Sequence, residues 1–352
     1  MVKKNTAIQN YLLSICIPTY NRATVLKESL RSLVEQECFS EVELVISDNC
    51  STDDTQSVVE EYAKKYSNIR YFRNEENVHD QNFPLALMRA TGEYRKLFSD
   101  SWSYEDGALS YLLNLVREHR NDKPFLFFEN GILLKDKRRD LIFASNLSEF
   151  LNYVSCRITW ISGFGLWAED CVQLDKEFEW CSTFLWQVYK ACKVISAKKR
   201  SVISSRKILS AASSLKDFEK NKDRSYGVYK VFYENYFNIL KPYIDDGSID
   251  TDCAKKLKKD VLYGQFLELF VAIPLQNENV GSETNYKRLV RDAYKNEPYY
   301  LHFCIAYRIK YVLEIIRQKR EARLVALKSR TADSLIIRFL LMIKRKLHIK
   351  LY

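Results

Sequence analysis

The chain has 352 residues, 47% of them hydrophobic and 13% aromatic, which is enough for a core larger than a single domain usually holds. Its 9 glycines and 6 prolines exclude collagen-like and linker-rich proteins. Much of the net charge of +10 comes from residues 311–352, where 11 Lys and Arg stand against 3 Asp and Glu. Because the rest of the chain is nearly neutral, no nucleic-acid partner is expected.

Cysteine and histidine usage argues against a disulfide framework and a zinc site. The 9 cysteines form no C-x-x-C pair, and the 4 histidines are not at zinc spacing. Cys16, Cys192 and Cys304 lie in apolar segments, where a free thiol acts as a small hydrophobic residue. The N-terminus does not look like a secretion signal, so we expect a cytoplasmic protein.

Apolar runs alternate with amphipathic segments in the first half of the chain. Strands are expected at residues 12–17, 42–47, 69–72, 94–98 and 125–130. Helices are expected at residues 23–37, after the turn at 51–53, through residue 88, and at 107–119. This order predicts an α/β fold in which a mixed, mostly parallel sheet is flanked by helices.

The second half is less regular at first and then helical. We expect residues 131–157 to be irregular and residues 158–167 to form a strand broken by Gly163 and Gly165. This G-x-G lacks a third glycine and a following Lys, which excludes Rossmann and P-loop phosphate sites. From about residue 210, aromatic and aliphatic residues recur at helical spacing and predict a helical C-terminal domain.

These patterns predict a sheet domain over 1–210, a helical domain over 211–332 and a basic amphipathic tail over 333–352. The apolar stretch in the tail, residues 335–343, is too short to span a bilayer. The tail favours a helix lying on an anionic membrane surface, which would make the protein peripheral on the inner face of the cell membrane. A terminal helix that docks on its own domain, or that dimerises, is the alternative.

Polar side chains follow three of the predicted strands. Ligands of open parallel sheets bind in the crevice beyond the carboxyl ends of the strands. We therefore expect a binding site formed by Pro18, Thr19, Tyr20, Asn21, Arg22, Asp48, Asn49, Ser99 and Asp100.

Three motifs at these strand ends resemble those of family 2 glycosyltransferases with the GT-A fold. PTYNR (18–22) and SDNCSTDDT (47–55) are similar to the family's P-x-[YF]-N and D-[DN]-G-S-x-D elements, and LFSDSW (97–102) lies where the family has D-x-D. The resemblance is close over residues 12–110. It implies inverting transfer of a sugar from a nucleotide diphospho-sugar, UDP before TDP, CDP or GDP. The acceptor it implies is a hydroxyl of a growing surface glycan or a lipid-linked acceptor.

The resemblance also implies roles for single residues. Asp48 would accept a hydrogen bond from uracil, and Thr19 and Asn21 would line the same pocket. Asp80 and Asn82 match positions that support the base and the ribose. Each of these residues also suits an ordinary helix start, and Arg22 can meet a phosphate or lie at the surface.

A divalent metal, Mn²⁺ or Mg²⁺, is implied at Asp100, although Ser101 and Trp102 stand where the family has further acidic residues. Inverting transfer also needs a carboxylate base, for which Glu179 beside Trp180 is the first candidate and Asp170 the second. Aromatic residues in this part of the chain are expected to form either a sugar-stacking wall or core: Trp160, Phe164, Trp167, Trp180 and Trp186.

Two other functions stay open. One is a GT-A-fold partner protein that binds sugar or nucleotide with little or no activity. The other is a protein that works through its basic tail on a membrane or nucleic-acid surface.

Overall fold

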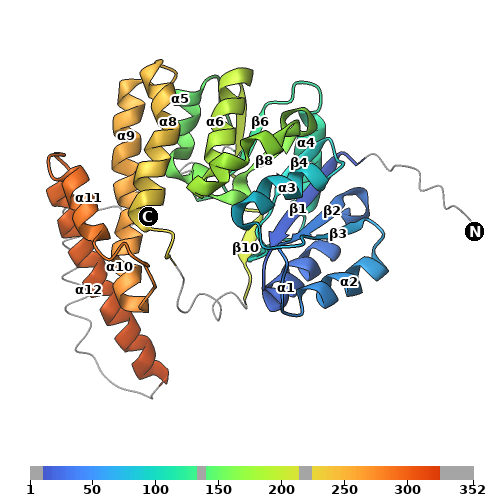
Figure 1. Ribbon diagram of the computed structural model, residues 1–352, viewed down its shortest axis with the longest axis horizontal. Helices are drawn as coiled ribbons and strands as arrows, with labels where there is room; N and C mark the ends of the chain where they lie inside the picture. Colours follow the sequence, from blue (N-terminus) through green and yellow to red (C-terminus); the bar gives the residue numbers. More distant parts are fainter. Residues whose placement is uncertain (1–10, 133–139, 214–223, 326–352) are drawn as a thin grey trace, which may run out of the picture. The chain divides into compact units, whose positions relative to one another are not determined.

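The computed structural model describes residues 11–132, 140–213 and 224–325 (Figure 1). Of these, residues 11–132, 140–213 and 238–250 form one compact unit, and residues 224–237 and 251–325 form a second. The predicted basic tail over 333–352 lies outside the described residues. None of the helices in the described part of the chain combines the length and hydropathy that crossing a membrane requires.

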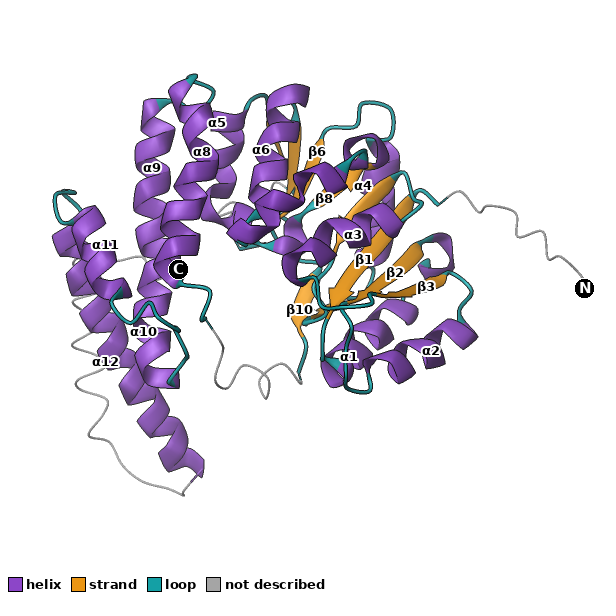
Figure 2. Ribbon diagram, in the orientation of Figure 1, coloured by secondary structure: helices purple, strands orange, loops and turns teal. Residues whose placement is uncertain are grey.

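A five-stranded sheet in the order β3-β2-β1-β4-β8 is the centre of the first unit (Figure 2). Its strands are β1 (Leu13–Thr19), β2 (Glu43–Asp48), β3 (Ile69–Arg73), β4 (Tyr94–Leu97) and β8 (Gly165–Trp167). The first four are parallel, and β8 runs antiparallel to β4. The chain builds outward from β1 to β3 and then returns to the other side of β1. The strand order therefore reverses between β1 and β4, where sheets of this kind bind ligands.

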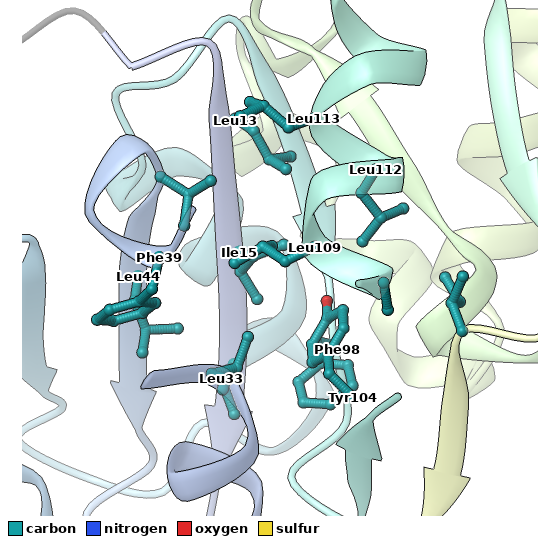
Figure 3. Packing of buried hydrophobic residues seen from close by; sticks show 14 of the residues in the cluster. Leu13, Ile15, Leu33, Phe39, Leu44, Phe98, Tyr104, Leu109, Leu112 and Leu113 are labelled. Atoms are coloured by element: carbon teal, nitrogen blue, oxygen red, sulfur yellow. The ribbon is translucent and has the colours of Figure 1, made fainter. Parts of the chain in front are cut away.

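Alternate residues of the strands build the main core. Leu13 and Ile15 of β1 pack with leucines of α4 (Ala108–Glu118), among them Leu109 and Leu112 (Figure 3). The helices α1 (Ala23–Val34) and α2 (Thr55–Lys65) contribute to the same cluster, and α3 (Asn82–Arg89) packs against β1 and β2. The mixed, mostly parallel sheet flanked by helices that the sequence predicts is confirmed.

Smaller elements complete the first unit. A second sheet has the order β6-β9-β7, made of β6 (Phe125–Phe128), β7 (Leu141–Ala144) and β9 (Ser201–Ser204). A ribbon pairs β5 (Trp102–Tyr104) with β10 (Leu209–Ala211), and the helices are α5 (Leu147–Val154) and α6 (Trp186–Lys198). The 3₁₀ segments are η1 (Phe39–Glu41), η2 (His79–Gln81), η3 (Ser155–Thr159), η4 (Ile161–Gly163), η5 (Ala168–Cys171) and η6 (Leu174–Thr183).

Two local expectations are wrong. Residues 131–157 are not simply irregular, because β7 and α5 lie within them. The start of α5 is capped by side chains: Asn146 Oδ1 accepts from the Glu149 amide at 2.8 Å, and Glu149 Oε2 accepts from the Ser145 amide at 2.8 Å. Residues 158–167 are mostly 3₁₀ turns, and only the last three form a strand.

The second unit is helical. Its elements after residue 250 are α9 (Thr251–Val261), the π-helical turn η8 (Leu262–Phe266), α10 (Leu267–Gln276), α11 (Tyr286–Tyr294) and α12 (Tyr300–Val325). Aromatic rings pack at its centre, where Phe270 meets Tyr286, Phe303 and Tyr307 at centroid distances of 5.5–5.6 Å. The predicted helical C-terminal region is confirmed, while its boundary at residue 211 stays a prediction.

The G-x-G at residues 163–165 serves close packing. A Cβ at Gly165 would lie 2.5 Å from Tyr94 Oη, and one at Gly163 would lie 2.7 Å from Phe127 Cζ. Because Tyr94 is fully buried, its ring cannot move aside freely. Gly165→Ala is therefore expected to lower the free energy of unfolding by about 1–3 kcal/mol, measured by urea denaturation. An unchanged midpoint would show that the strand β8 shifts to make room.

Candidate functional site

The site lies where β1 and β4 end, at the reversal of strand order. Thr19, the last residue of β1, donates a hydrogen bond from Oγ1 to Asp100 Oδ2 at 2.8 Å. Asp100 lies in the turn that joins β4 to β5, and Ser29 of α1 holds this turn. Its Oγ is 2.6 Å from the backbone oxygens of both Asp100 and Trp102. The predicted meeting of residues 19 and 100 is therefore present in the structure.

Arg22 joins the same cluster. Its Nη1 donates to Ser101 Oγ at 2.6 Å and lies 3.5 Å from Asp100 Oδ1. Ser101 Oγ in turn donates to Asp100 Oδ1 at 3.2 Å. Burial raises the pKa of Asp100, while the charge of Arg22 and the hydrogen bond from Thr19 act in the opposite direction. Asp100 thus anchors three side chains from two strand ends.

Asp48 ends β2 and is fully buried. Its Oδ1 accepts from the Ser51 amide at 2.9 Å, and its Oδ2 accepts from Tyr71 Oη at 2.6 Å. The Arg73 Nε atom lies 3.7 Å from Oδ2. A base that reaches this carboxylate must therefore take the place of the Tyr71 hydroxyl.

An asparagine network fixes the loop that follows β3. Asn49 Oδ1 accepts from Asn74 Nδ2 and from the Val78 amide, both at 2.9 Å. Asn82 Nδ2 donates to the Ser47 carbonyl at 2.7 Å. Asn49 and Asn82 are buried within this network, so they hold the loop in place.

The other predicted donor-site residues surround these groups. Asn21 has a positive φ of 51° and accepts from the Thr52 amide at 2.7 Å, which ties the β1 end to the β2 end. Tyr20 is 43% exposed beside it, and Pro18 is half-buried within β1. The Ser99 amide donates to Ser162 Oγ at 3.0 Å.

Asp80 lies on η2, in the loop held by the asparagine network. Burial raises its pKa to about 6, against a smaller opposing effect of His79. The sequence places Asp80 near the base and ribose of a nucleotide, and this role stays a prediction.

The two carboxylates predicted as a base lie in different places. Glu179 is exposed on η6, which packs against η2 and α3. Asp170 follows β8, and its Oδ2 is 2.8 Å from Lys198 Nζ. Because β8 is antiparallel and pairs Trp167 with Tyr94, it ends where β4 begins. Asp170 therefore lies at the opposite end of the sheet from Asp100, and the structure does not bring the two together.

The predicted aromatic group divides into core and partly exposed residues. Phe164, Trp167 and Trp186 are buried to within about one per cent. Trp180 is half-buried and stacks on Tyr189, with ring centroids 4.2 Å apart and an interplanar angle of 8°. Trp160 is also half-buried, and packs edge-on against Trp102 at 5.4 Å. Only the last pair lies beside the turn that carries Asp100.

The donor set around Asp100 fits a metal ion poorly. Both carboxylate oxygens are already engaged by Thr19, Ser101 and Arg22. The next positions offer a serine and an indole, whose N–H is a donor only. No group of three or more His, Cys, Asp or Glu suited to a metal occurs in residues 11–132, 140–213 and 224–325.

Sequence reasoning missed several contributors to this site. Asn74 directly follows β3, so the rule that found residues 19 and 48 could also have found it. Tyr71 and Arg73 contact Asp48 through their side chains. Both belong to β3 and not to a turn, so a search for polar residues after strands does not find them. Ser29 lies inside a helix, and no sequence signal marks it.

Known proteins are similar to the part of the chain that builds this site. The sequence model described as glycosyl transferase family 2 matches residues 14–153. The abequosyltransferase RfbV of Salmonella typhimurium is 38% identical over 104 residues, which are 29% of this chain and 31% of that protein. The GalNAc(5)-diNAcBac-PP-undecaprenol beta-1,3-glucosyltransferase of Campylobacter jejuni is 34% identical over 108 residues, 30% of this chain and 35% of that protein. The matched segment thus spans about a third of each of these relatives.

Among solved structures, residues 1–349 of Staphylococcus aureus TarS in complex with UDP-GlcNAc are similar at 20% identity and a TM-score of 0.46. The match covers 73% of this chain and 72% of that chain. At this level the likeness carries no argument, and the fold rests on the strand order described above. The family match falls on β1 to α5, which include every strand end of the site. The site therefore lies within the segment that matches glycosyl transferase family 2.

Proposed function

We propose that this protein is an inverting glycosyltransferase. It moves a sugar from a nucleoside diphosphate-sugar, UDP-sugar first, to a hydroxyl of a growing surface glycan or a lipid-linked acceptor. The observation that supports this most is the hydrogen bond between Thr19 and Asp100. It joins the ends of two strands where the strand order reverses, within the segment that matches family 2. Inversion and the acceptor class follow from the family resemblance.

The parts of the site suit the parts of such a donor. Asp48 offers acceptors for a base N–H, and Tyr20, one residue beyond the partner of Asp48 on β1, offers an exposed ring for stacking. Arg22 offers positive charge for the diphosphate. Glu179 is the base of this proposal, because η6 packs against the loop that carries Asp80. A metal at Asp100 is not part of the proposal, since the donor set does not suit one.

The proposal is tested by a screen of nucleoside diphosphates and their sugars. UDP, dTDP, CDP and GDP are added separately in a thermal-shift experiment, and release of nucleoside diphosphate from the matching sugars is then measured. We expect one nucleotide to raise the unfolding temperature and its sugar to be hydrolysed slowly without an acceptor. If no nucleotide stabilises the protein and no donor is hydrolysed, the proposal is wrong, and a partner protein without transferase activity becomes the better explanation.

Asp48→Asn tests the base contact. Loss of a charge-assisted hydrogen bond is expected to weaken binding of the stabilising nucleotide by about ten- to a hundredfold, measured by isothermal titration. Asp252→Asn, at a carboxylate that is 97% exposed, is the matched control and should leave the affinity unchanged. Equal affinities for Asp48→Asn and the wild type would remove Asp48 from the nucleotide pocket.

A further inference from the structure

The turn after β4 lacks the several acidic residues that would hold a metal ion to neutralise the charge of the donor diphosphate. It holds one carboxylate, Asp100, followed by a serine and a tryptophan. Asp100 is 5% exposed, and its oxygens accept from Thr19 and Ser101. A diphosphate leaving group nevertheless needs positive charge close to it as the bond to the sugar breaks.

Arg22 is the cation that the structure places at this turn. The side chain is 41% exposed, whereas its partner Asp100 is almost completely buried. Only Nη1 is engaged, by Ser101 and Asp100. Within the described residues, Nη2 and Nε have no hydrogen-bond partner, and the N–H groups on these two nitrogens of a planar guanidinium suit phosphate oxygens.

The position of Arg22 is fixed from both sides. It lies three residues beyond the end of β1 at Thr19 and directly before the first residue of α1, so its backbone lies between two regular elements. The Arg22 side chain is held by its ion pair with Asp100, and Ser29 fixes the turn that carries Asp100. A charge that is held in place before the ligand arrives needs little reorganisation to stabilise a developing anion.

Arg22 also opposes a metal at the same place. A dication bound to Asp100 Oδ1 would stand within a few ångströms of the guanidinium, because Nη1 is only 3.5 Å from that oxygen. The two cations would repel each other unless the arginine left. Trp102 offers no ligand in exchange, and packs edge-on against Trp160.

We propose that Arg22, rather than a divalent metal, supplies the positive charge that meets the donor diphosphate, so that donor binding does not depend on metal. This inference rests on the proposed function, because it assumes a nucleoside diphosphate-sugar at the site. It assigns Arg22 to the phosphates and leaves Asp100 as the residue that positions Arg22.

The experiment is isothermal titration of the stabilising nucleoside diphosphate, and of its nucleoside, into the full chain. Each titration is made in EDTA and again in Mn²⁺. For the wild type we expect dissociation constants within about threefold of each other in the two buffers. Arg22→Gln should weaken the diphosphate by at least about tenfold and leave the nucleoside unchanged, and Arg22→Lys should fall between the two.

Arg31→Gln is the control, since Arg31 lies on α1, the helix that Arg22 precedes, in an exposed pair with Glu35, and should behave as the wild type. A loss of about tenfold or more on chelation in the wild type would overturn the inference while leaving the proposed function intact. So would an Arg22→Gln variant that weakens the nucleoside as much as the diphosphate, because that result indicates a structural role. Absence of any nucleotide binding in both buffers would sink the proposed function itself.

Discussion

Replacing Asp100 by alanine is expected to lower the rate of sugar transfer by at least about 100-fold, because misplacing groups around a reacting centre by an ångström has effects of this size. Thr19, Arg22 and Ser101 all contact this carboxylate. Without it, the guanidinium has no fixed position opposite the diphosphate. The measurement is kcat/KM for the donor that the nucleotide screen identifies, with folding checked by circular dichroism.

Asp100→Asn separates the hydrogen bonds that residue 100 accepts from the negative charge of its carboxylate. The amide can still accept from Thr19, so this variant should recover part of the lost rate, chiefly through kcat. Asp252→Ala is the control at an exposed carboxylate and should keep full activity. If Asp100→Ala transfers sugar at the wild-type rate, Asp100 has no part in the reaction, and the turn after β4 is only structural.

The second large effect concerns stability and comes from Lys96. This lysine lies in β4 with no exposed surface, over the ring of Phe128 at 4.9 Å. Its Nζ donates to the backbone carbonyl of Ser162 and, at 3.3 Å, to that of Leu97. Burial lowers its pKa from 10.5 to about 7. Above about pH 7 the folded protein therefore favours the neutral amine, whereas the unfolded chain keeps the proton up to about pH 10.5.

The sign of the pH dependence follows from proton counts. Between pH 7 and 10.5 the unfolded state binds more protons at this lysine, so the free energy of unfolding rises with pH across that window. We expect Lys96→Met to remove up to about 1 kcal/mol per pH unit of this slope, measured by urea denaturation at pH 7, 8 and 9. Lys27→Met, at an exposed lysine of α1, should keep the wild-type slope. Equal slopes for Lys96→Met and the wild type would mean that water or a rearrangement keeps the buried ammonium charged.

The sheet was predictable because its strands are continuous apolar runs between clear turns. Residues 42–47 and 94–98, for example, have no helical period and coincide with β2 and β4 to within a residue. Pattern recognition failed over 131–167, where the elements are short and held by packing. The N-cap at Asn146 was readable there, but the close packing of Gly163 on Phe127 and of Gly165 on Tyr94 is known only from the fold.

The residues of the candidate site were predictable where they lie at the ends of predicted strands. Thr19, Asp48 and Asp100 follow or end predicted strands, so topology alone brings them to one edge. The contacts between them were not predictable, because they depend on side-chain directions. The same limit applies to Asp170, which is near Glu179 in sequence but follows a strand of opposite direction.

The first unit draws on two separate stretches of the sequence, and only one of them supplies the contacts around Asp100. The four parallel strands and the turn with Asp100 come from one uninterrupted stretch, residues 13–100. The strands β8 and β9 and the segment η6 come from residues 165–204. The contacts that hold Thr19, Arg22 and Asp100 together therefore lie within the earlier stretch and the residue after it, whereas the exposed carboxylate Glu179 belongs to the later one.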